Sequence, residues 1–209
     1  MTEPRTKAAH TFAREADNWY VEPADVTAAL CRAEGFPGRT VDPCAGMGHT
    51  VIGAAAAGVQ IEGYDLRDRG NRAVAAGRDF FAPHQLPGMW PCDNIISNPP
   101  YGRNDQPGER PRLEEQFVEL ALQRTRRKVA VFLHASWMNG AARQDWLAAL
   151  PLYRVYLVSP RPSCLPGHMI QSGEKPGGGT KDYAWFVFLH GFEGDPVIRF
   201  LRRGEKCAS

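Results

Sequence analysis

Short apolar runs alternate along the chain with segments in which apolar residues recur at helical spacing. Residues 129–133 (Val-Ala-Val-Phe-Leu) are apolar throughout, which is typical of a parallel strand buried on both faces. Over residues 113–125, by contrast, Phe117, Leu120 and Ala121 fall on one face of a predicted helix. This alternation predicts an α/β fold, with a mostly parallel sheet of about seven strands and helices on both faces.

The same pattern predicts where the other elements lie. Further helices are expected near residues 26–33, 51–57 and 141–150, and further strands near 40–42, 60–65, 94–96, 153–158, 184–189 and 197–201. The Gly-containing turn at 191–195 is short, so the last two strands are expected to pair as an antiparallel end hairpin. Ligands of such sheets bind in the crevice outside the carboxyl ends of the strands, where a site is therefore expected.

Length and composition fit one domain over residues 1–209. The chain is 43% hydrophobic and 23% charged, which are ordinary values for a globular protein of 209 residues. Its net charge of +2 does not by itself indicate a nucleic-acid partner, although basic residues cluster at 124–128 and 199–206. No membrane span is expected, because no apolar run is long enough to cross a bilayer.

Cysteine usage indicates a reducing compartment, so a cytoplasmic location is expected. The five cysteines include no Cys-x-x-Cys pair, so neither a disulfide framework nor a zinc site of the usual spacing is predicted. Cys164 and His168 share a segment, but two candidate ligands without a second pair make a poor metal site, and none is expected.

The most informative stretch is Ser97-Asn98-Pro99-Pro100-Tyr101, directly after a short apolar run. Each proline fixes its own φ, lacks an amide donor and pushes the preceding residue out of the helical region. The result is a rigid, extended corner at the carboxyl end of a strand. It can hold a planar group that carries an amine, because the side-chain oxygen of Asn98 and the Pro99 carbonyl can each accept an N–H while Tyr101 stacks on the ring. A plain Pro-Pro turn is the alternative.

A glycine-rich turn precedes that corner by one β-α-β unit. Residues 40–50 pass from a short strand into a turn that contains Gly46 and Gly48, and an Ala-rich helix follows, which Gly58 is expected to end. Glycines let the backbone approach a ligand closely, and the following helix offers free N–H groups. Such turns are common, and it is the position ahead of the corner that favours a cofactor site.

An acidic residue follows at the spacing of dinucleotide-binding folds. Asp65 ends the predicted strand at 60–65, 19 residues after Gly46, where such folds bind a ribose diol. We therefore expect Asp65 to contact a cofactor ribose, and a solvated loop acid is the alternative. The charged residues at 67–69 are expected to be surface charges.

Together these segments resemble the motifs of amino-methyltransferases, which use S-adenosylmethionine to methylate adenine N6, cytosine N4 or a glutamine amide. Asn98, Pro99, Pro100 and Tyr101 resemble their catalytic motif. The resemblance implies the Rossmann-like class I methyltransferase fold, with S-adenosyl-L-methionine as the cofactor. It also implies direct transfer of the methyl group, without a covalent enzyme intermediate.

The resemblance further implies a set of cofactor contacts. The glycine-rich turn would wrap the methionine moiety, and an acid followed by an aromatic residue, Asp79-Phe80, would meet the adenine ring. The segment before the first helix resembles an aromatic-x-x-proline motif that contacts the cofactor, although Glu22 stands where threonine is usual, and a hydrophobic staple is the alternative. The implied cofactor-binding residues are Tyr20, Pro23, Asp42, Pro43, Cys44, Ala45, Gly46, Gly48, Asp65, Asp79 and Phe80.

Two long segments are expected to contact the substrate. Residues 102–112 are rich in Gly, Pro and charge, and they are expected to become ordered only when nucleic acid is present. Residues 159–181 form the second segment, in which Arg161 is a substrate-binding candidate. Asp182-Tyr183-Ala184-Trp185 resembles a motif whose aromatic residue packs against a flipped base, so Trp185 is another candidate. A core strand with alternating aromatic residues is the alternative for Trp185.

With Arg161-Pro162-Ser163, the chain most resembles small DNA adenine N6 methyltransferases of phages and prophages. Restriction-linked relatives carry a separate target-recognition domain, for which only about twenty residues remain here. Sequence recognition would then come from the two long segments or from a partner chain, or it would be lax. A homodimer is one candidate assembly. DNA is the expected partner. The alternatives are methylation of RNA or of a protein glutamine, and a non-catalytic nucleic-acid-binding module.

Overall fold

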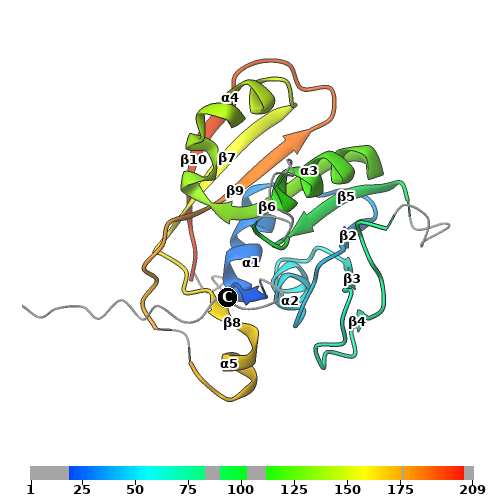
Figure 1. Cartoon of the computed structure of the whole chain (residues 1–209), viewed down its shortest axis with the longest axis vertical. Helices are drawn as coiled ribbons and strands as arrows, with labels where there is room; N and C mark the ends of the chain where they lie inside the picture. Colours follow the sequence, from blue (N-terminus) through cyan, green and yellow to red (C-terminus); the bar gives the residue numbers. More distant parts are fainter. Residues whose placement is uncertain (1–18, 83–89, 103–111, 176, 205–209) are drawn as a thin grey trace, which may run out of the picture.

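The computed structural model describes residues 19–82, 90–102, 112–175 and 177–204 (Figure 1). Its helices are α1 (Ala24–Ala33), α2 (His49–Ala56), α3 (Leu113–Arg124), the 3-10 helix η1 (Ala135–Asn139), α4 (Ala141–Ala148) and α5 (Gly167–Gln171). Its strands are β1 (Tyr20–Val21), β2 (Thr40–Asp42), β3 (Ile61–Tyr64), β4 (Val74–Ala75), β5 (Cys92–Ser97), β6 (Thr125–His134), β7 (Leu152–Ser159), β8 (Leu165–Pro166), β9 (Tyr183–Leu189) and β10 (Val197–Arg202).

Eight of the described strands form one sheet in the order β10-β7-β9-β6-β5-β2-β3-β4. The strands from β6 to β4 are parallel to their neighbours, whereas β9 runs antiparallel to both β6 and β7. Strands β2, β3 and β5 therefore end at the same edge of the sheet, and the segments that follow them meet there. The mostly parallel α/β fold predicted from the sequence is confirmed.

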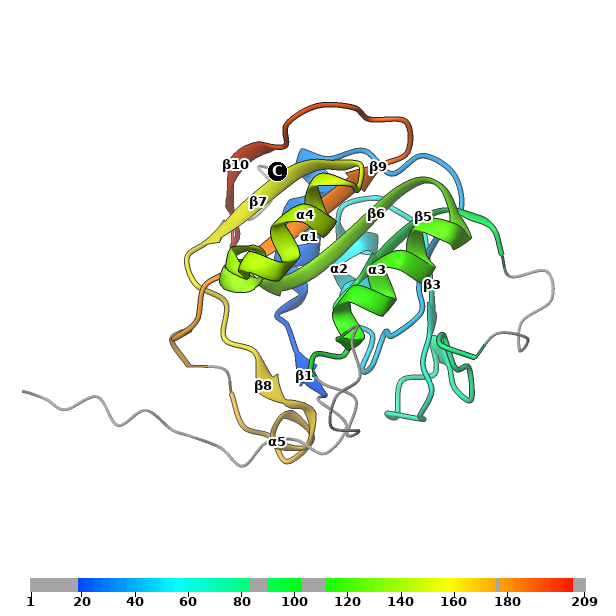
Figure 2. The same ribbon diagram turned by 45° about the horizontal axis from the view of Figure 1, so that its top comes forward.

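Helices cover both faces of this sheet (Figure 2). On one face α3 and α4 pack through Phe117, Val118 and Leu147, and on the other α1 packs through Val26 and Leu30. Alternate residues of β6 belong to the two cores, since Val129, Val131 and Leu133 face α3 while Ala130 and Phe132 face α1. The continuous apolar run in β6 is thus explained by burial on both faces.

The predicted hairpin between the last two strands is wrong. Strand β10 pairs in parallel with β7, with Val197 opposite Arg154 and Arg202 opposite Ser159. It cannot pair with β9, because both edges of β9 are already hydrogen-bonded, to β6 and to β7. The chain after β9 therefore passes over β7 and adds an eighth strand at the edge of the sheet.

The segment at 159–181 is more regular than the sequence predicted. It contains β8 and α5, and β8 pairs antiparallel with β1 to form a second sheet, with Tyr20 opposite Pro166. Figure 1 shows this small sheet and α5 extending from one end of the main sheet. For the other long segment, at 102–112, residues 103–111 lie outside the described part of the chain.

Helix ends follow the expected chemistry. Gly58 follows α2 with a φ of +77°, and its N–H donates to the carbonyl of Ala55 at 3.0 Å, as a glycine that ends a helix does. Pro23 lies one residue before α1, as its N-cap. Among the described residues no helix is both long and apolar enough to cross a membrane.

Candidate active site

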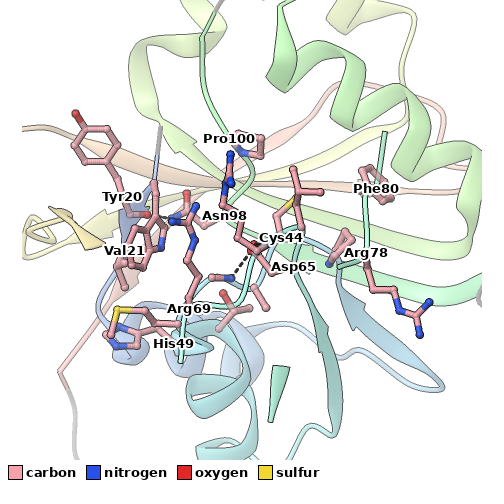
Figure 3. A pocket seen from close by; sticks show the side chains of 18 of the residues that line it. Tyr20, Val21, Cys44, His49, Asp65, Arg69, Arg78, Phe80, Asn98 and Pro100 are labelled. Carbon is pink, nitrogen blue, oxygen red and sulfur yellow. Dashed lines mark hydrogen bonds between the residues drawn. The ribbon is translucent and has the colours of Figure 1, made fainter. Parts of the chain in front are cut away.

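A pocket opens where β2, β3 and β5 end, as the strand order predicts. It contains about 880 Å³ of space, part of it open to solvent. Figure 3 shows Asn98 and Pro100 near its centre, with His49 on one side and Phe80 on the other. The lining residues are Trp19, Tyr20, Val21, Glu22, Pro43, Cys44, Ala45, Gly46, Met47, His49, Thr50, Asp65, Leu66, Arg67, Arg69, Arg78, Asp79, Phe80, Phe81, Asn98 and Pro100.

The floor of the pocket is the glycine-rich turn between β2 and α2. Gly46 and Gly48 have φ values of +53° and +80°, which only glycine adopts freely. A Cβ on Gly48 would come within 3.0 Å of the side-chain amide of Asn71, and that amide donates to the Met47 carbonyl at 2.7 Å. Gly48 therefore shapes the turn from outside the lining, whereas Gly46 lies in the lining.

Asp42 organises this turn from beneath. It is fully buried, and its Oδ1 accepts hydrogen bonds from the Cys44 N–H at 3.0 Å and the Ser97 hydroxyl at 2.7 Å. Its Oδ2 has no hydrogen-bond partner among the described residues. Burial raises the pKa of Asp42 to about 7. Asp42 thus lies behind the pocket, where it fixes the turn against the strand that carries Asn98.

Asp65 lies beside the turn, at the end of β3, and lines the pocket as the spacing predicted. Its Oδ2 accepts the Gly46 N–H at 2.8 Å and its Oδ1 accepts the Arg67 N–H at 2.9 Å. A carboxylate oxygen has two lone pairs, so each can accept one more hydrogen bond from a ligand. A bond from Asp65 to a ribose is therefore chemically available and stays a prediction.

Asp79 and Phe80 form the far wall. Both line the pocket, and Asp79 Oδ1 accepts the Phe81 N–H at 2.9 Å. The Phe80 ring is only 3% exposed, because it packs 4.7 Å from the Phe117 ring and lies beneath the Arg124 guanidinium at 4.6 Å. Phe80 is thus a core residue with one edge in the pocket.

The Asn98 amide is held from two sides. Its Nδ2 donates to the Tyr20 carbonyl at 2.9 Å and to Glu22 Oε2 at 2.6 Å. A carbonyl and a carboxylate can only accept, so the two bonds fix which end of the amide is nitrogen. The Asn98 oxygen consequently points the other way, toward the hydroxyl of Tyr101.

Tyr101 lies next to the pocket rather than in its lining. Its hydroxyl is within hydrogen-bond distance of Asn98 Oδ1 and of the Phe132 carbonyl, at 2.8 Å from the latter, and its single proton can serve one of them at a time. Its ring faces His134 with centroids 5.7 Å apart. Burial raises the pKa of Tyr101, so the hydroxyl stays protonated. Stacking of Tyr101 on a substrate stays a prediction.

The structure corrects the role predicted for Trp185. This side chain is fully buried beneath α1, and its indole N–H donates to the Val26 carbonyl at 3.2 Å. It cannot contact a base from there, so the core-strand alternative holds. Arg161 is 57% exposed and pairs with Asp182 at 2.6 Å, and its role in substrate binding stays untested.

Two further predicted residues lie outside the pocket lining. Pro23 lies behind it at the start of α1, where its carbonyl accepts the Val26 N–H at 3.1 Å. Pro99 directly follows Asn98 and is buried, as part of the rigid corner after β5. Among the residues implied for the cofactor, Tyr20, Pro43, Cys44 and Ala45 do line the pocket.

Sequence reasoning missed several residues of the pocket wall. Trp19 lines the pocket, packs on Gly167 and lies beneath the Arg69 guanidinium, which is 4.0 Å from its ring. Arg69, expected to be a surface charge, is therefore part of the wall. Glu22 is 4% exposed and joins three segments. The glutamate at position 22, where threonine is usual, was the available signal, but burial of a charge is not visible in a sequence.

Comparisons with solved structures identify the fold. The chain is similar to a candidate class I S-adenosylmethionine-dependent methyltransferase from Listeria monocytogenes, with TM-score 0.57, 11% identity and coverage of 84% of this chain and 62% of the other. It is similar to the EcoKI type I restriction enzyme M protein, with TM-score 0.55, 13% identity and coverage of 93% of this chain and 51% of the other. It is also similar to a candidate RNA methyltransferase from Pyrococcus horikoshii, with TM-score 0.53, 14% identity and coverage of 79% of this chain and 82% of the other.

These likenesses show the Rossmann-like fold of class I methyltransferases, as the resemblance implied. The chain spans 62% and 51% of the Listeria and EcoKI proteins. No protein-family model and no curated protein matches the sequence.

Proposed function

We propose that this protein is an S-adenosylmethionine-dependent methyltransferase that acts on the exocyclic amine of a DNA base, adenine N6. The observation that carries the proposal is the Asn98 amide, which two acceptors hold in the lining of the pocket where β2, β3 and β5 end. Its oxygen has two lone pairs, so beside the Tyr101 hydroxyl it can accept one more hydrogen bond, from an amine.

The pocket suits the proposed cofactor. Asp65 and Asp79 offer acceptors for ribose hydroxyls and an adenine amine, and the glycine turn leaves room for a ligand against the backbone. Within the described residues the buried indole N–H of Trp19 has no hydrogen-bond partner. That N–H lies 3.1 Å from where a Cβ on Gly46 would be, so a ligand beside the turn has a donor available.

The chain's own residues position the amine. Asn98 Oδ1 and the Pro99 carbonyl would each accept one of its N–H groups, directing the nitrogen lone pair toward the pocket. When bound, the cofactor would supply an electrophilic methyl group: the methyl–sulfur bond would break as the new C–N bond forms, and the nitrogen would release one proton to solvent. Acceptors that strengthen as nitrogen gains positive charge would stabilise the transition state.

DNA as the substrate is supported by two solved structures of similar fold that contain DNA, and the motif at the corner is compatible with it. Similar folds occur in DrdV, whose structure contains DNA, and in the DNA-bound restriction-modification enzyme LlaBIII, at TM-scores of 0.53 and 0.50. The Asn-Pro-Pro-Tyr corner resembles the catalytic motif of amino-methyltransferases, whose substrates include adenine N6 and cytosine N4. An amine inside a duplex is out of reach, so the target base would have to be flipped out of the stack.

RNA is the second candidate, because the Pyrococcus structure belongs to a candidate RNA methyltransferase. The test is to incubate the pure protein with labelled cofactor and DNA, RNA or protein, and to identify the product by nucleoside mass spectrometry. N6-methyladenine in DNA is the expected result. Label in RNA or in a glutamine would replace the DNA assignment. Binding of cofactor and DNA without any transfer would leave a non-catalytic module.

A further inference from the structure

Glu22 is a buried charge that joins three parts of the site. Its Oε2 accepts from Asn98 Nδ2 at 2.6 Å and its Oε1 accepts from the Thr50 hydroxyl at 2.9 Å. The Glu22 carbonyl is 2.7 Å from His49 Nδ1. A carboxylate that is 4% exposed is costly to keep unless hydrogen bonds compensate for its desolvation. Its placement behind the proposed catalytic amide therefore calls for an explanation.

The contact with Asn98 has the features of a strong hydrogen bond. It is 2.6 Å long and its acceptor is a buried carboxylate, an environment in which electrostatic interactions are stronger than in water. A negative group at the amide nitrogen draws positive charge there and leaves more negative charge on the amide oxygen. The Asn98 oxygen then becomes a better acceptor for an amine.

The same geometry explains an asparagine at position 98. An aspartate there would bring two acceptor oxygens against the Tyr20 carbonyl and the Glu22 carboxylate, with no proton to donate to either. Two carboxylates at that distance would also repel each other. Asparagine with a carboxylate behind it keeps the negative charge one hydrogen bond away and leaves the acceptor uncharged.

We propose that Glu22 is a positioning residue for methyl transfer, which orients the Asn98 amide and polarises it so that its oxygen accepts the target amine more strongly. The inference rests on the proposed function, since it assigns Asn98 to the amine. Glu22 acts through Asn98, whereas Asn98 contacts the substrate.

This role requires Glu22 to be ionised. Burial raises the pKa of Glu22, while the hydrogen bonds from Asn98 and Thr50 oppose that rise. The other titratable groups that interact with Glu22 are Asp42 at the end of β2, His49 at the start of α2, Tyr101 in the corner after β5, Cys164 just before β8 and Tyr183 at the start of β9. A carboxyl with a raised pKa loses its charge at a higher pH than usual, so the transfer rate should fall as pH falls through that pKa.

The experiment compares Glu22→Gln with the wild type in single-turnover transfer to DNA across a pH series. Glutamine can still accept from Asn98 and donate to Thr50, so it preserves the shape and removes the charge. We expect the rate above the pKa to fall about 10- to 100-fold, the loss for a hydrogen bond to a charged group, with cofactor affinity close to wild type. The acid limb of the wild-type profile should disappear. Glu34→Gln is the matched control, because Glu34 is equally buried but pairs with Lys128 and Arg154 away from the pocket.

A second readout does not depend on activity. The side-chain amide signals of Asn98, assigned by their loss in Asn98→Ala, should shift with pH in the wild type and stay constant in Glu22→Gln. A wild-type rate and pH profile in Glu22→Gln, with transfer still lost in Asn98→Ala, would overturn this proposal alone. Failure of the wild type to methylate any substrate would overturn the proposed function and this role with it.

Discussion

The Ser97 hydroxyl donates to Asp42 Oδ1 at 2.7 Å, which joins the last residue of β5 to the last residue of β2. Asp42 also accepts the N–H of Cys44 in the glycine-rich turn, and Ser97 directly precedes Asn98. One buried carboxylate thus sets the position of the amide corner relative to the turn. The cofactor and amine sites are aligned through the ends of two adjacent strands rather than through loops.

Asp42→Asn should change how stability depends on pH. Burial raises the pKa of Asp42 to about 7, above an ordinary value of 3.8. Its contribution to stability is therefore fully present below the unfolded pKa and is lost as pH rises through the folded one. Asparagine does not titrate, so the variant should gain stability relative to wild type from about pH 4 to about pH 8, by up to roughly 4 kcal/mol.

Urea unfolding at several pH values measures this difference. The exposed Asp195→Asn is a suitable control, because it removes a carboxyl far from the turn. A difference between Asp42→Asn and wild type that does not vary with pH would show that Asp42 titrates normally.

Gly48→Ala should be more harmful than Gly58→Ala. Both glycines have positive φ, +80° and +77°, so alanine is strained by about 1 kcal/mol at each. Only at position 48 would the new methyl group also displace Asn71 from the Met47 carbonyl, because nothing lies within 4 Å of a Cβ on Gly58. Unfolding free energies and cofactor affinities of the two variants provide the measurement, and equal losses at both positions would contradict the prediction.

Asp65→Ala should weaken cofactor binding by about 1–3 kcal/mol, through lost charge-assisted hydrogen bonds. Part of that loss would come from the turn, since Asp65 also accepts the Gly46 N–H. Calorimetry with S-adenosylmethionine is the measurement. Asp68→Ala is the control, because it removes an exposed acid three residues away, outside the pocket lining. Unchanged affinity in Asp65→Ala would remove this residue from the site.

Asn98→Ala should nearly abolish methyl transfer while leaving cofactor affinity close to wild type. The amide oxygen acts on the amine, and one preorganised contact of this kind is worth about 2.7–4 kcal/mol, or roughly 100- to 1,000-fold in rate. The loss should appear in kcat more than in KM. Single-turnover assays on DNA, RNA and protein substrates would report it. Wild-type turnover on the best substrate would mean that the corner is only a turn.

Tyr101 separates stacking from hydrogen bonding. Tyr101→Ala should weaken binding of an extruded base by the value of one aromatic stack, about 1–3 kcal/mol. Tyr101→Phe keeps the ring and removes the hydroxyl that approaches Asn98 and Phe132, so it should retain base affinity. Fluorescence titration with DNA that contains a base analogue at the target position would distinguish them. Equal losses in both variants would assign the effect to the hydroxyl.

The sequence predicted those features that local patterns determine. The apolar run of β6 indicated a strand buried on both faces, and the glycines of the turn and the acid at position 65 indicated a pocket where β2 and β3 end. Each of these depends on neighbours in the chain, so spacing and composition were sufficient.

Features that depend on distant partners were not predictable in the same way. The pairing of β10 with β7 depends on which sheet edges remain open, and β1 and β8 have only two residues each, too few for any periodicity. Trp185 has the same alternating pattern whether it faces a substrate or the core, and only the position of α1 decides between them.

Trp19 connects the pocket to the segment that carries β8 and α5. It lines the pocket, and its carbonyl accepts the Gly167 N–H at 3.0 Å, next to the small sheet that anchors residues 159–181. A molecule that stabilises Trp19 from the pocket side therefore also stabilises that segment, and the converse must hold. If a substrate also binds to that segment, thermodynamic linkage requires that a filled pocket and a bound substrate change each other's affinity by the same factor.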